Sequence, residues 1–339
     1  MQIEHKIGQM LLFGWQGSTD ERSRSFNKHA ERLISEFNVG GVIIMGRNVG
    51  TPDRLRHTIR DLQLKTKANG NPSLFVAVDQ EGGRVLRLQP PYWPVRRSAF
   101  EIGKTNDPGE ARREAASIGE DLKSVGINWN FAPVMDVNNN PHNPVIGDRS
   151  YSVDPTVVSA MGIATIEGYQ IDNKIMACAK HFPGHGDTAV DSHFALPIIP
   201  HNMDRLNACE LVPFEAAIKH QTASIMTSHI LFPALDPLLP ATLSASIINE
   251  LLRARMGFNG IVVTDCLEMR GVADQWGSSE AAVLSVIAGA DILLCCHTEK
   301  TQYQILQALL AALRSGRLTE SRIDESLDRI NKAKNTWIH

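Results

Sequence analysis

Short apolar runs alternate with longer amphipathic segments along the whole chain, and this alternation limits the possible folds more than any other feature. The short runs are often bounded by Gly, Asn or Pro, as strands buried on both faces of a parallel sheet are. They lie at Met10–Phe13, Val42–Met45, Leu74–Val78, Trp129–Pro133, Met176–Ala179, Ser224–Thr227, Ile261–Thr264 and Ile292–Cys295. The sequence therefore predicts eight buried strands.

A helical pattern follows each of these strands. The expected helices are Asn27–Phe37, Pro52–Lys67, Glu110–Val125, Pro155–Gln170, Asp204–Lys219, Ser246–Met256, Ser279–Ala288 and Thr301–Arg314, with a further helix at about Glu320–Lys334. The pairs Thr51-Pro52 and Asp154-Pro155 each supply an N-cap followed by a first-turn proline. Strand followed by helix, eight times over, predicts an α/β fold, a single (β/α)8 barrel of the TIM type over residues 1–339 that ends in the further helix. A doubly wound sheet with extra strands is the main alternative.

Charge and composition narrow the classes of partner. The hydrophobic fraction of 43% is normal for a globular protein, and 34 Lys and Arg residues are balanced by 37 Asp and Glu residues. The basic residues are scattered, so the chain has no footprint for nucleic acid or an anionic membrane. The apolar segment Ile7–Trp15 is too short to span a bilayer and lacks a small-residue cleavage site. A small neutral molecule is the expected partner, and no oligomeric state is indicated.

The cysteines indicate the cellular compartment. They are Cys178, Cys209, Cys266, Cys295 and Cys296. Their number is odd, two are adjacent, and no C-x-x-C pair occurs, which favours reduced, buried thiols over a disulfide scaffold. We therefore expect a cytoplasmic protein.

Ionisable side chains gather where the predicted strands end. These residues are Asp79, Asp136, Lys180 with His181, His229, Asp265 and His297. In (β/α)8 barrels the chemistry takes place at the C-terminal ends of the strands and in the loops that follow them. The sequence therefore predicts an active site at this end of the barrel.

The richest segment runs from Lys180 to His193 and reads K-H-F-P-G-H-G-D-T-A-V-D-S-H. The strand delivers Lys180 and His181 to the barrel mouth, and a Gly- and Pro-containing loop carries Asp191 and His193. Residues two apart in an extended segment point to the same side, so this carboxylate can orient the imidazole and stabilise its protonated form. The alternative is a polar loop whose Asp and His only satisfy backbone groups.

Two further strand ends carry carboxylates. Asp265 follows a β-branched strand and lies where a nucleophile could reach an anomeric carbon, although a helix N-cap is the rival interpretation. Asp79 is followed by paired glycines that allow close approach to a ligand, and it suits a bidentate hold on two sugar hydroxyls. Arg87 can donate to sugar oxygens in a fork, and Arg149 lies on another loop.

Taken together, these segments resemble glycoside hydrolase family 3, and within it the bacterial β-N-acetylglucosaminidase branch. The most specific element is K-H-F-P-G-H-G-D-T followed by D-S-H, at residues 180–188 and 191–193, and the resemblance covers nearly the whole chain. It implies that Asp265 is the nucleophile and that His193 is the acid/base, with Asp191 as its partner. Lys180 and His181 would bind the terminal sugar, as would Asp79, Arg87 and Arg149.

The implied reaction is exo-cleavage of a terminal N-acetylglucosamine, with retention, through a covalent glycosyl-enzyme. The substrate would be a chitin oligosaccharide or a peptidoglycan fragment, and no cofactor or metal is expected. Because a His replaces one of the usual two carboxyl groups, phosphate could also enter, so a phosphorylase is one alternative.

The same residues allow two further interpretations. In a metal-dependent barrel hydrolase, His181, His185, Asp187, Asp191 and His193 would ligate the ion. A barrel that only binds sugars would explain Asp79 and Arg87, but it leaves Asp265 without a role.

Overall fold

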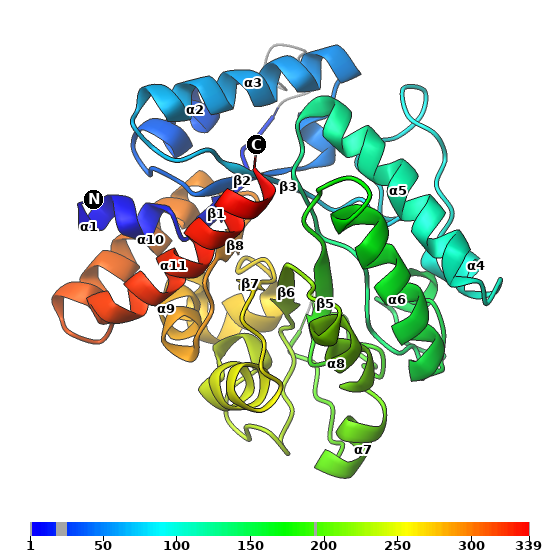
Figure 1. The fold of residues 1–339 in the computed structure, drawn as a ribbon. Helices are drawn as coiled ribbons and strands as arrows, with labels where there is room; N and C mark the ends of the chain where they lie inside the picture. Colours follow the sequence, from blue (N-terminus) through cyan, green and yellow to red (C-terminus); the bar gives the residue numbers. More distant parts are fainter. Residues whose placement is uncertain (1, 18–25, 193–194, 339) are drawn as a thin grey trace.

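The computed structural model describes residues 2–17, 26–192 and 195–338, and eight parallel strands form its centre (Figure 1). The strands are β1 (Leu11–Phe13), β2 (Gly41–Ile44), β3 (Phe75–Val78), β4 (Trp129–Asn130), β5 (Cys178–Phe182), β6 (Ser224–Thr227), β7 (Ile261–Thr264) and β8 (Leu293–Cys295). One sheet has the order β4-β3-β2-β1-β8 and the other β5-β6-β7. Single bridges at Trp129–Met176 and Val263–Ile292 join the two sheets. The pairings thus pass through all eight predicted strands and back to the first, which confirms the predicted barrel order.

Helices surround these strands. They are α1 (Ile3–Gly8), α2 (Lys28–Ser35), α3 (Pro52–Ala68), α4 (Ala99–Gly103), α5 (Pro108–Val125), α6 (Pro155–Gln170), α7 (Met203–Ala208), α8 (Val212–Lys219), a π-helix (Ser246–Arg255), α9 (Arg270–Ala288), α10 (Glu299–Arg314) and α11 (Glu320–Trp337). Both predicted N-caps are confirmed: the Thr51 side chain accepts from the Arg54 N–H, and the Asp154 side chain accepts from the Thr156 N–H. None of the described helices is long and apolar enough to cross a membrane.

Two predicted helices differ from the structure. The segment expected to form one helix from Asp204 to Lys219 is two helices, α7 and α8, because Pro213 lies in the first turn of α8. A proline is tolerated there but would break a continuous helix. Helix α9 begins earlier than predicted, at Arg270, and is kinked at Gly277, which has a φ of 72°.

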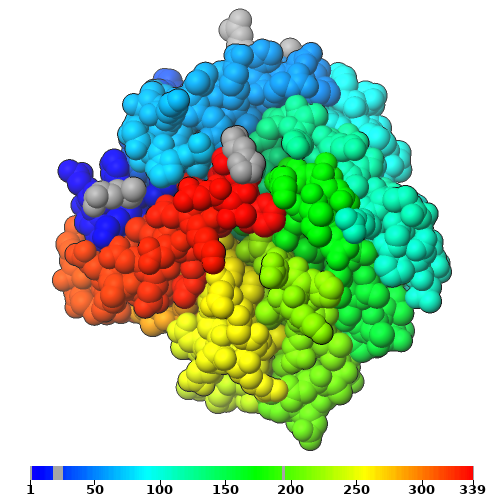
Figure 2. Space-filling model, viewed as in Figure 1, coloured from blue at the N-terminus to red at the C-terminus, as the bar shows by residue number. Residues whose placement is uncertain are grey.

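The C-terminal helix α11 crosses the N-terminal ends of the strands, opposite the end where the chemistry is expected. Figures 1 and 2 show it as the red segment that lies across this face of the molecule. Its buried Lys334 donates to the Gln9 side chain, which precedes β1, at 2.9 Å, and lies 5.3 Å from the ring centre of Phe75 in β3. The helix therefore covers this end of the barrel core.

Asp291, which precedes β8, connects α11 to the barrel. Its fully buried carboxylate pairs with Arg253 of the π-helix at 2.5 Å and with Arg329 of α11 at 3.1 Å. Arg322 of α11 lies 3.5 Å away, and the Val262 backbone N–H donates to the same carboxylate at 2.9 Å. One buried anion thus compensates three partly buried guanidinium groups.

Replacing Asp291 should destabilise the fold. In Asp291→Ala the three guanidinium groups lose their shared counter-charge, and the free energy of unfolding should decrease by about 3 kcal/mol. Urea unfolding followed by tryptophan fluorescence measures this. The matched control is Asp324→Ala in α11. This variant removes an exposed ion-pair partner of Lys6 and should have little effect on stability. Equal stability of the two variants would contradict the role of Asp291.

Candidate active site

A cavity of about 350 Å³ opens at the C-terminal ends of the strands. Its walls include Met45, which follows β2, Leu294 of β8, and Cys296 and His297, which follow β8. Six residues that the sequence predicted for the site line it together: Asp79, Arg87, Arg149, Lys180, His181 and Asp265. Four of them, Asp79, Lys180, His181 and Asp265, were predicted from the strand ends, and they come together although they are up to 186 positions apart in the sequence (79 to 265).

Strand β5 contributes two adjacent side chains to this cavity. Consecutive residues of a regular strand point to opposite faces, yet both Lys180 and His181 line the cavity. The pairing between β5 and β6 shifts register between Lys180 and Phe182. Such an irregularity re-aims a side chain, so it accounts for both residues reaching the same site.

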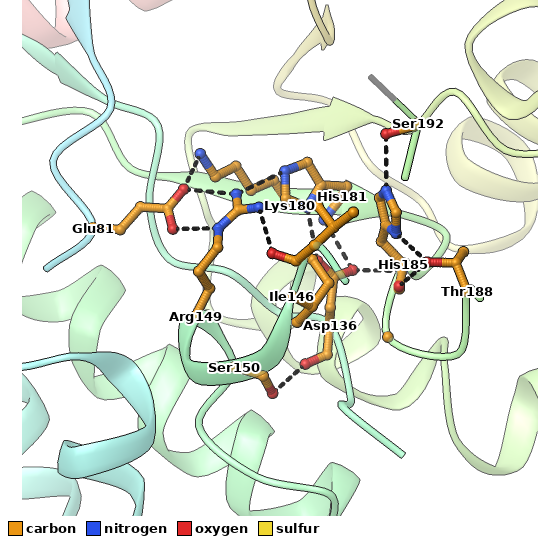
Figure 3. Close-up of polar contacts among 12 residues, drawn as sticks. Glu81, Asp136, Ile146, Arg149, Ser150, Lys180, His181, His185, Thr188 and Ser192 are labelled. Atoms are coloured by element: carbon orange, nitrogen blue, oxygen red, sulfur yellow. Dashed lines mark hydrogen bonds and ion pairs between the residues drawn. The ribbon is translucent and has the colours of Figure 1, made fainter. Parts of the chain in front are cut away.

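Glu81 holds two cations of the site in place. It forms a bidentate ion pair with Arg149 at 2.8 and 2.9 Å, and it lies 2.6 Å from the Lys180 ammonium (Figure 3). Burial alone would raise the pKa of Glu81, but Arg149 and Lys180 hold it far below its usual range. No role for Glu81 was predicted from the sequence, since it lies beyond the strand end and its partners are distant along the chain.

Lys180 is buried and pairs with a second carboxylate, Asp79, at 2.9 Å. Burial would lower the pKa of Lys180, but the Asp79 and Glu81 carboxylates raise it above its ordinary value. Arg87 lies 3.4 Å from the other oxygen of Asp79. Asp79 therefore presents a carboxylate to the cavity between two fixed cations, an arrangement suited to binding neighbouring hydroxyl groups.

Asp136 fixes the orientation of His181. The His181 ring contacts the fully buried Asp136 carboxylate through Nδ1 at 2.7 Å, and its Nε2 lies 3.3 Å from Arg149 (Figure 3). Because Arg149 can only donate, the proton of a neutral ring belongs on Nδ1. The same carboxylate accepts the backbone N–H groups of His181 and His185. Asp136 was predicted as a strand-end residue, but its role in orienting His181 was not.

Asp265 stands at the end of β7 as predicted, and it does not act as the N-cap of a regular helix, because α9 starts at Arg270. Its side chain accepts the Cys266 N–H at 2.7 Å. Burial would raise the pKa of Asp265, but the neighbouring His229 and His181 rings and the Cys266 N–H hold it below its ordinary value. The carboxylate is therefore ionised at neutral pH, as a nucleophile must be.

The loop after β5 is held by buried polar contacts. The His185 ring lies 2.9 Å from the Thr188 hydroxyl and 3.0 Å from the Ser192 hydroxyl. The carbonyl of Ser192 accepts the Gly271 N–H of α9 at 3.0 Å. Asp191 is partly buried and is not among the residues that line the cavity. His193 lies outside the described residues, so its predicted position beside Asp191 stays a prediction.

Three of the residues expected to bind the ion of a metal-dependent hydrolase, His181, His185 and Asp187, make polar contacts with other side chains instead. Both ring nitrogens of His181 and of His185 have the partners given above, and Asp187 lies 2.5 Å from His201. Within residues 2–17, 26–192 and 195–338, the groups of residues that could hold an ion are Cys266–Cys296–His297 and Asp187–His201–Glu210. Neither group is the set that the sequence suggested.

The burial of His185 makes stability depend on pH. Burial and the nearby His181 lower the pKa of His185 to about 4, whereas an imidazole in the unfolded chain titrates near 6.5. The unfolded chain therefore binds more protons between these values, and stability falls as the pH decreases from about 6.5 to about 4, by at most about 1.4 kcal/mol per pH unit. In His185→Gln this contribution should vanish. Urea unfolding from pH 7.5 to 4.5 measures it, and parallel profiles for the two proteins would contradict the assignment.

Known proteins are similar to this chain in sequence and in fold. Residues 2–333 match the family model described as the glycosyl hydrolase family 3 N-terminal domain. Beta-hexosaminidase A of Pseudoalteromonas piscicida is 37% identical over 324 residues, which cover 89% of this chain and 54% of that protein. Beta-hexosaminidase LpqI of Mycobacterium tuberculosis is 35% identical over 337 residues, covering 97% of this chain and 82% of the relative. The chain thus spans about half the length of the first relative and most of the second.

Solved structures agree with these matches. A family 3 β-N-acetylglucosaminidase from Paenibacillus sp. str. FPU-7 superposes with a TM-score of 0.94 at 41% identity, over 99% of this chain and 62% of that one. A β-N-acetylhexosaminidase from Beutenbergia cavernae superposes with a TM-score of 0.90 at 28% identity, over 99% of both chains. With a family match over nearly its whole length and relatives above 30% identity, the chain belongs to glycoside hydrolase family 3.

Proposed function

We propose that this protein is an exo-acting, retaining β-N-acetylglucosaminidase whose nucleophile is Asp265, with residues 1–339 acting as one catalytic barrel. The observation that carries the proposal is an ionised carboxylate at the end of β7 in a small cavity whose walls hold fixed cations and a second carboxylate. A metal-free double displacement needs such a nucleophile beside a hydroxyl-binding wall. The names of the family relatives support the cleavage of N-acetylhexosaminides, although not a particular nucleophile.

The proposed reaction has two steps. Asp265 attacks the anomeric carbon and forms an ester while His193 protonates the departing oxygen, so the glycosidic bond breaks as the new bond forms. His193 then takes a proton from a water molecule that attacks the same carbon and releases Asp265. Two inversions at one carbon give net retention. An imidazole suits both tasks because its ordinary pKa lies near neutral pH, and we propose that Asp191 orients it.

The proposed substrate carries one N-acetylglucosamine at its non-reducing end. A cavity of about 350 Å³ lies at the small end of the range for ligand sites and has room for about one sugar ring. Asp79 offers acceptors to hydroxyl groups in this space and Lys180 offers donors, while Arg87 and Arg149 add further donors. Chitin oligosaccharides and peptidoglycan fragments both end in this sugar, so we propose either as the natural substrate. We also propose that the protein acts in the cytoplasm.

Replacing Asp265 should abolish turnover. The Asp265→Ala variant loses the bond-forming group, so kcat should decrease by about 10⁴-fold or more. A fluorinated N-acetylglucosaminide should trap a sugar ester on Asp265 of the parent protein, seen by mass spectrometry of peptides. Asp274→Ala, an exposed carboxylate on α9, is the control and should keep full activity. An adduct on another residue, or none during turnover, would show that the 2-acetamido group or another side chain is the nucleophile.

Removing His193 should affect poor leaving groups most. An activated aryl group departs without protonation, so His193→Ala should spare aryl substrates and slow alkyl or sugar leaving groups by about 10²–10⁴-fold. Asp191→Ala should show a milder form of the same trend. The measurement is kcat/KM across a series of leaving groups. A uniform loss across the series would mean that His193 has a structural role.

The enzyme should require the 2-acetamido group. Polar groups arranged around a substituent lose their partners when it is absent, so β-glucosides should react about 100-fold more slowly or worse. We would compare kcat/KM for matched nitrophenyl glycosides, and follow product sizes on chitotriose with and without added phosphate. Similar rates on both glycosides, or early internal cuts, would contradict the proposal. Appearance of a sugar phosphate would identify a phosphorylase instead.

A further inference from the structure

Two cysteines and a histidine meet on the wall of the active-site cavity. Cys266 follows β7, and Cys296 and His297 follow the neighbouring strand β8; all three line the cavity. One ligand atom from each, two sulfurs and a ring nitrogen, lie within 4.8 Å of one another. The proposed sugar contacts and the proposed reaction use none of these atoms.

We propose that Cys266, Cys296 and His297 form a binding site for a thiophilic divalent metal ion such as Zn²⁺. Two thiolates and an imidazole are the ligands that zinc prefers in proteins, and they discriminate against Mg²⁺ and Ca²⁺, which take oxygen ligands. The separations observed without an ion are close enough for small side-chain rotations to bring the three atoms to one centre.

Surrounding contacts prepare the site for a cation. The Glu268 carboxylate lies 3.8 Å from the Cys266 sulfur, and it accepts the backbone N–H groups of His297 and Thr298 at 2.7 and 2.8 Å. These hydrogen bonds hold a carboxylate oxygen beside the Cys266 sulfur, where it can serve as a fourth ligand or a counter-charge.

Arg47 also sets a limit on the site. Its guanidinium donates to Nδ1 of His297 at 3.0 Å and to the carbonyl of Cys296, so an ion held through Nδ1 has to displace the first of these hydrogen bonds. The positive charge of Arg47 and the negative charge of Glu268 cancel, so the two thiolates balance the charge of one divalent ion. Binding therefore replaces the proton of each thiol with a metal–sulfur bond and releases both protons to solvent.

The position of this site gives metal binding a consequence. Cys266 adjoins Asp265 in sequence, and the two residues line the same cavity. An ion held there would occupy space beside the proposed nucleophile and exclude the sugar. This inhibitory effect rests on the proposed function, whereas the binding of metal does not.

Cobalt titration tests the binding directly. Reduced protein, kept in a phosphine reductant without chelators, is titrated with Co²⁺, and thiolate-to-cobalt charge-transfer absorption is followed. We expect this absorption to saturate at one ion per chain and to disappear on addition of Zn²⁺. Cys296→Ser and Cys266→Ser should lose it, whereas Cys209→Ser should keep it, since Cys209 is a partly buried thiol that does not line the cavity. Circular dichroism checks that each variant is folded.

The contrary outcomes are distinct. No thiolate–cobalt absorption in the parent protein, or equal absorption in a folded Cys296→Ser variant, would overturn the site. Ions held by Asp187, His201 and Glu210 would not produce this absorption, because that group has no sulfur.

A second measurement follows the rate on a nitrophenyl N-acetylglucosaminide as Zn²⁺ is added. Each protein is compared with its own metal-free rate. Zn²⁺ should inhibit the parent and Cys209→Ser at least tenfold more strongly than Cys296→Ser, and equal inhibition of all three would overturn the inhibitory effect. If the protein binds cobalt through sulfur but cleaves no such glycoside, the metal site stands and the proposed function fails.

Discussion

One buried carboxylate, Glu81, governs the arrangement of the candidate site. Two cations, Arg149 and Lys180, come from a loop after β4 and from β5; Lys180 is buried, and only 12% of the Arg149 side chain is exposed. Two positive groups so close together would repel one another and lose their hydration, a cost that only a well-placed anion offsets. Glu81 bonds to both, and Lys180 in turn fixes Asp79. The cations are therefore held in position before any sugar arrives, which lowers the cost of ordering them on binding.

The proposed catalytic residues come from two kinds of segment, the ends of the barrel strands and the loop after β5. Asp265 and the residues around Glu81 lie at or just beyond strand ends, where the sheet and the register shift in β5 set their directions. Asp191 instead belongs to a loop held through the hydroxyl contacts of His185 and by one backbone hydrogen bond to α9. At the opposite end, α11 covers the barrel and is joined to it by the ion pairs of Asp291. The loops that follow the strands lie at the other end, around the cavity.

The sequence alone predicted most of the fold because each strand and helix carries its own local signal. Strand runs, N-caps and the strand-end rule were enough to bring Asp79 and Lys180 into one cavity with Asp265. Contacts between distant segments carried no such signal. Asp136 orients a ring 45 positions away, and Glu81 lies in an irregular segment beyond the end of β3. The break before α8 could have been predicted from Pro213, a helix-start residue that the periodic pattern obscured.

The central claim is that cleavage is a double displacement at the anomeric carbon, with Asp265 as the proposed nucleophile, and the stereochemistry of the first product tests the double displacement most directly. Proton NMR recorded immediately after adding enzyme to a β-N-acetylglucosaminide shows the anomer released before mutarotation. Double displacement at one carbon predicts that β-N-acetylglucosamine appears first and the α-anomer only later. Initial release of the α-anomer would mean a single direct attack by water, and would contradict the assignment of Asp265 as the nucleophile.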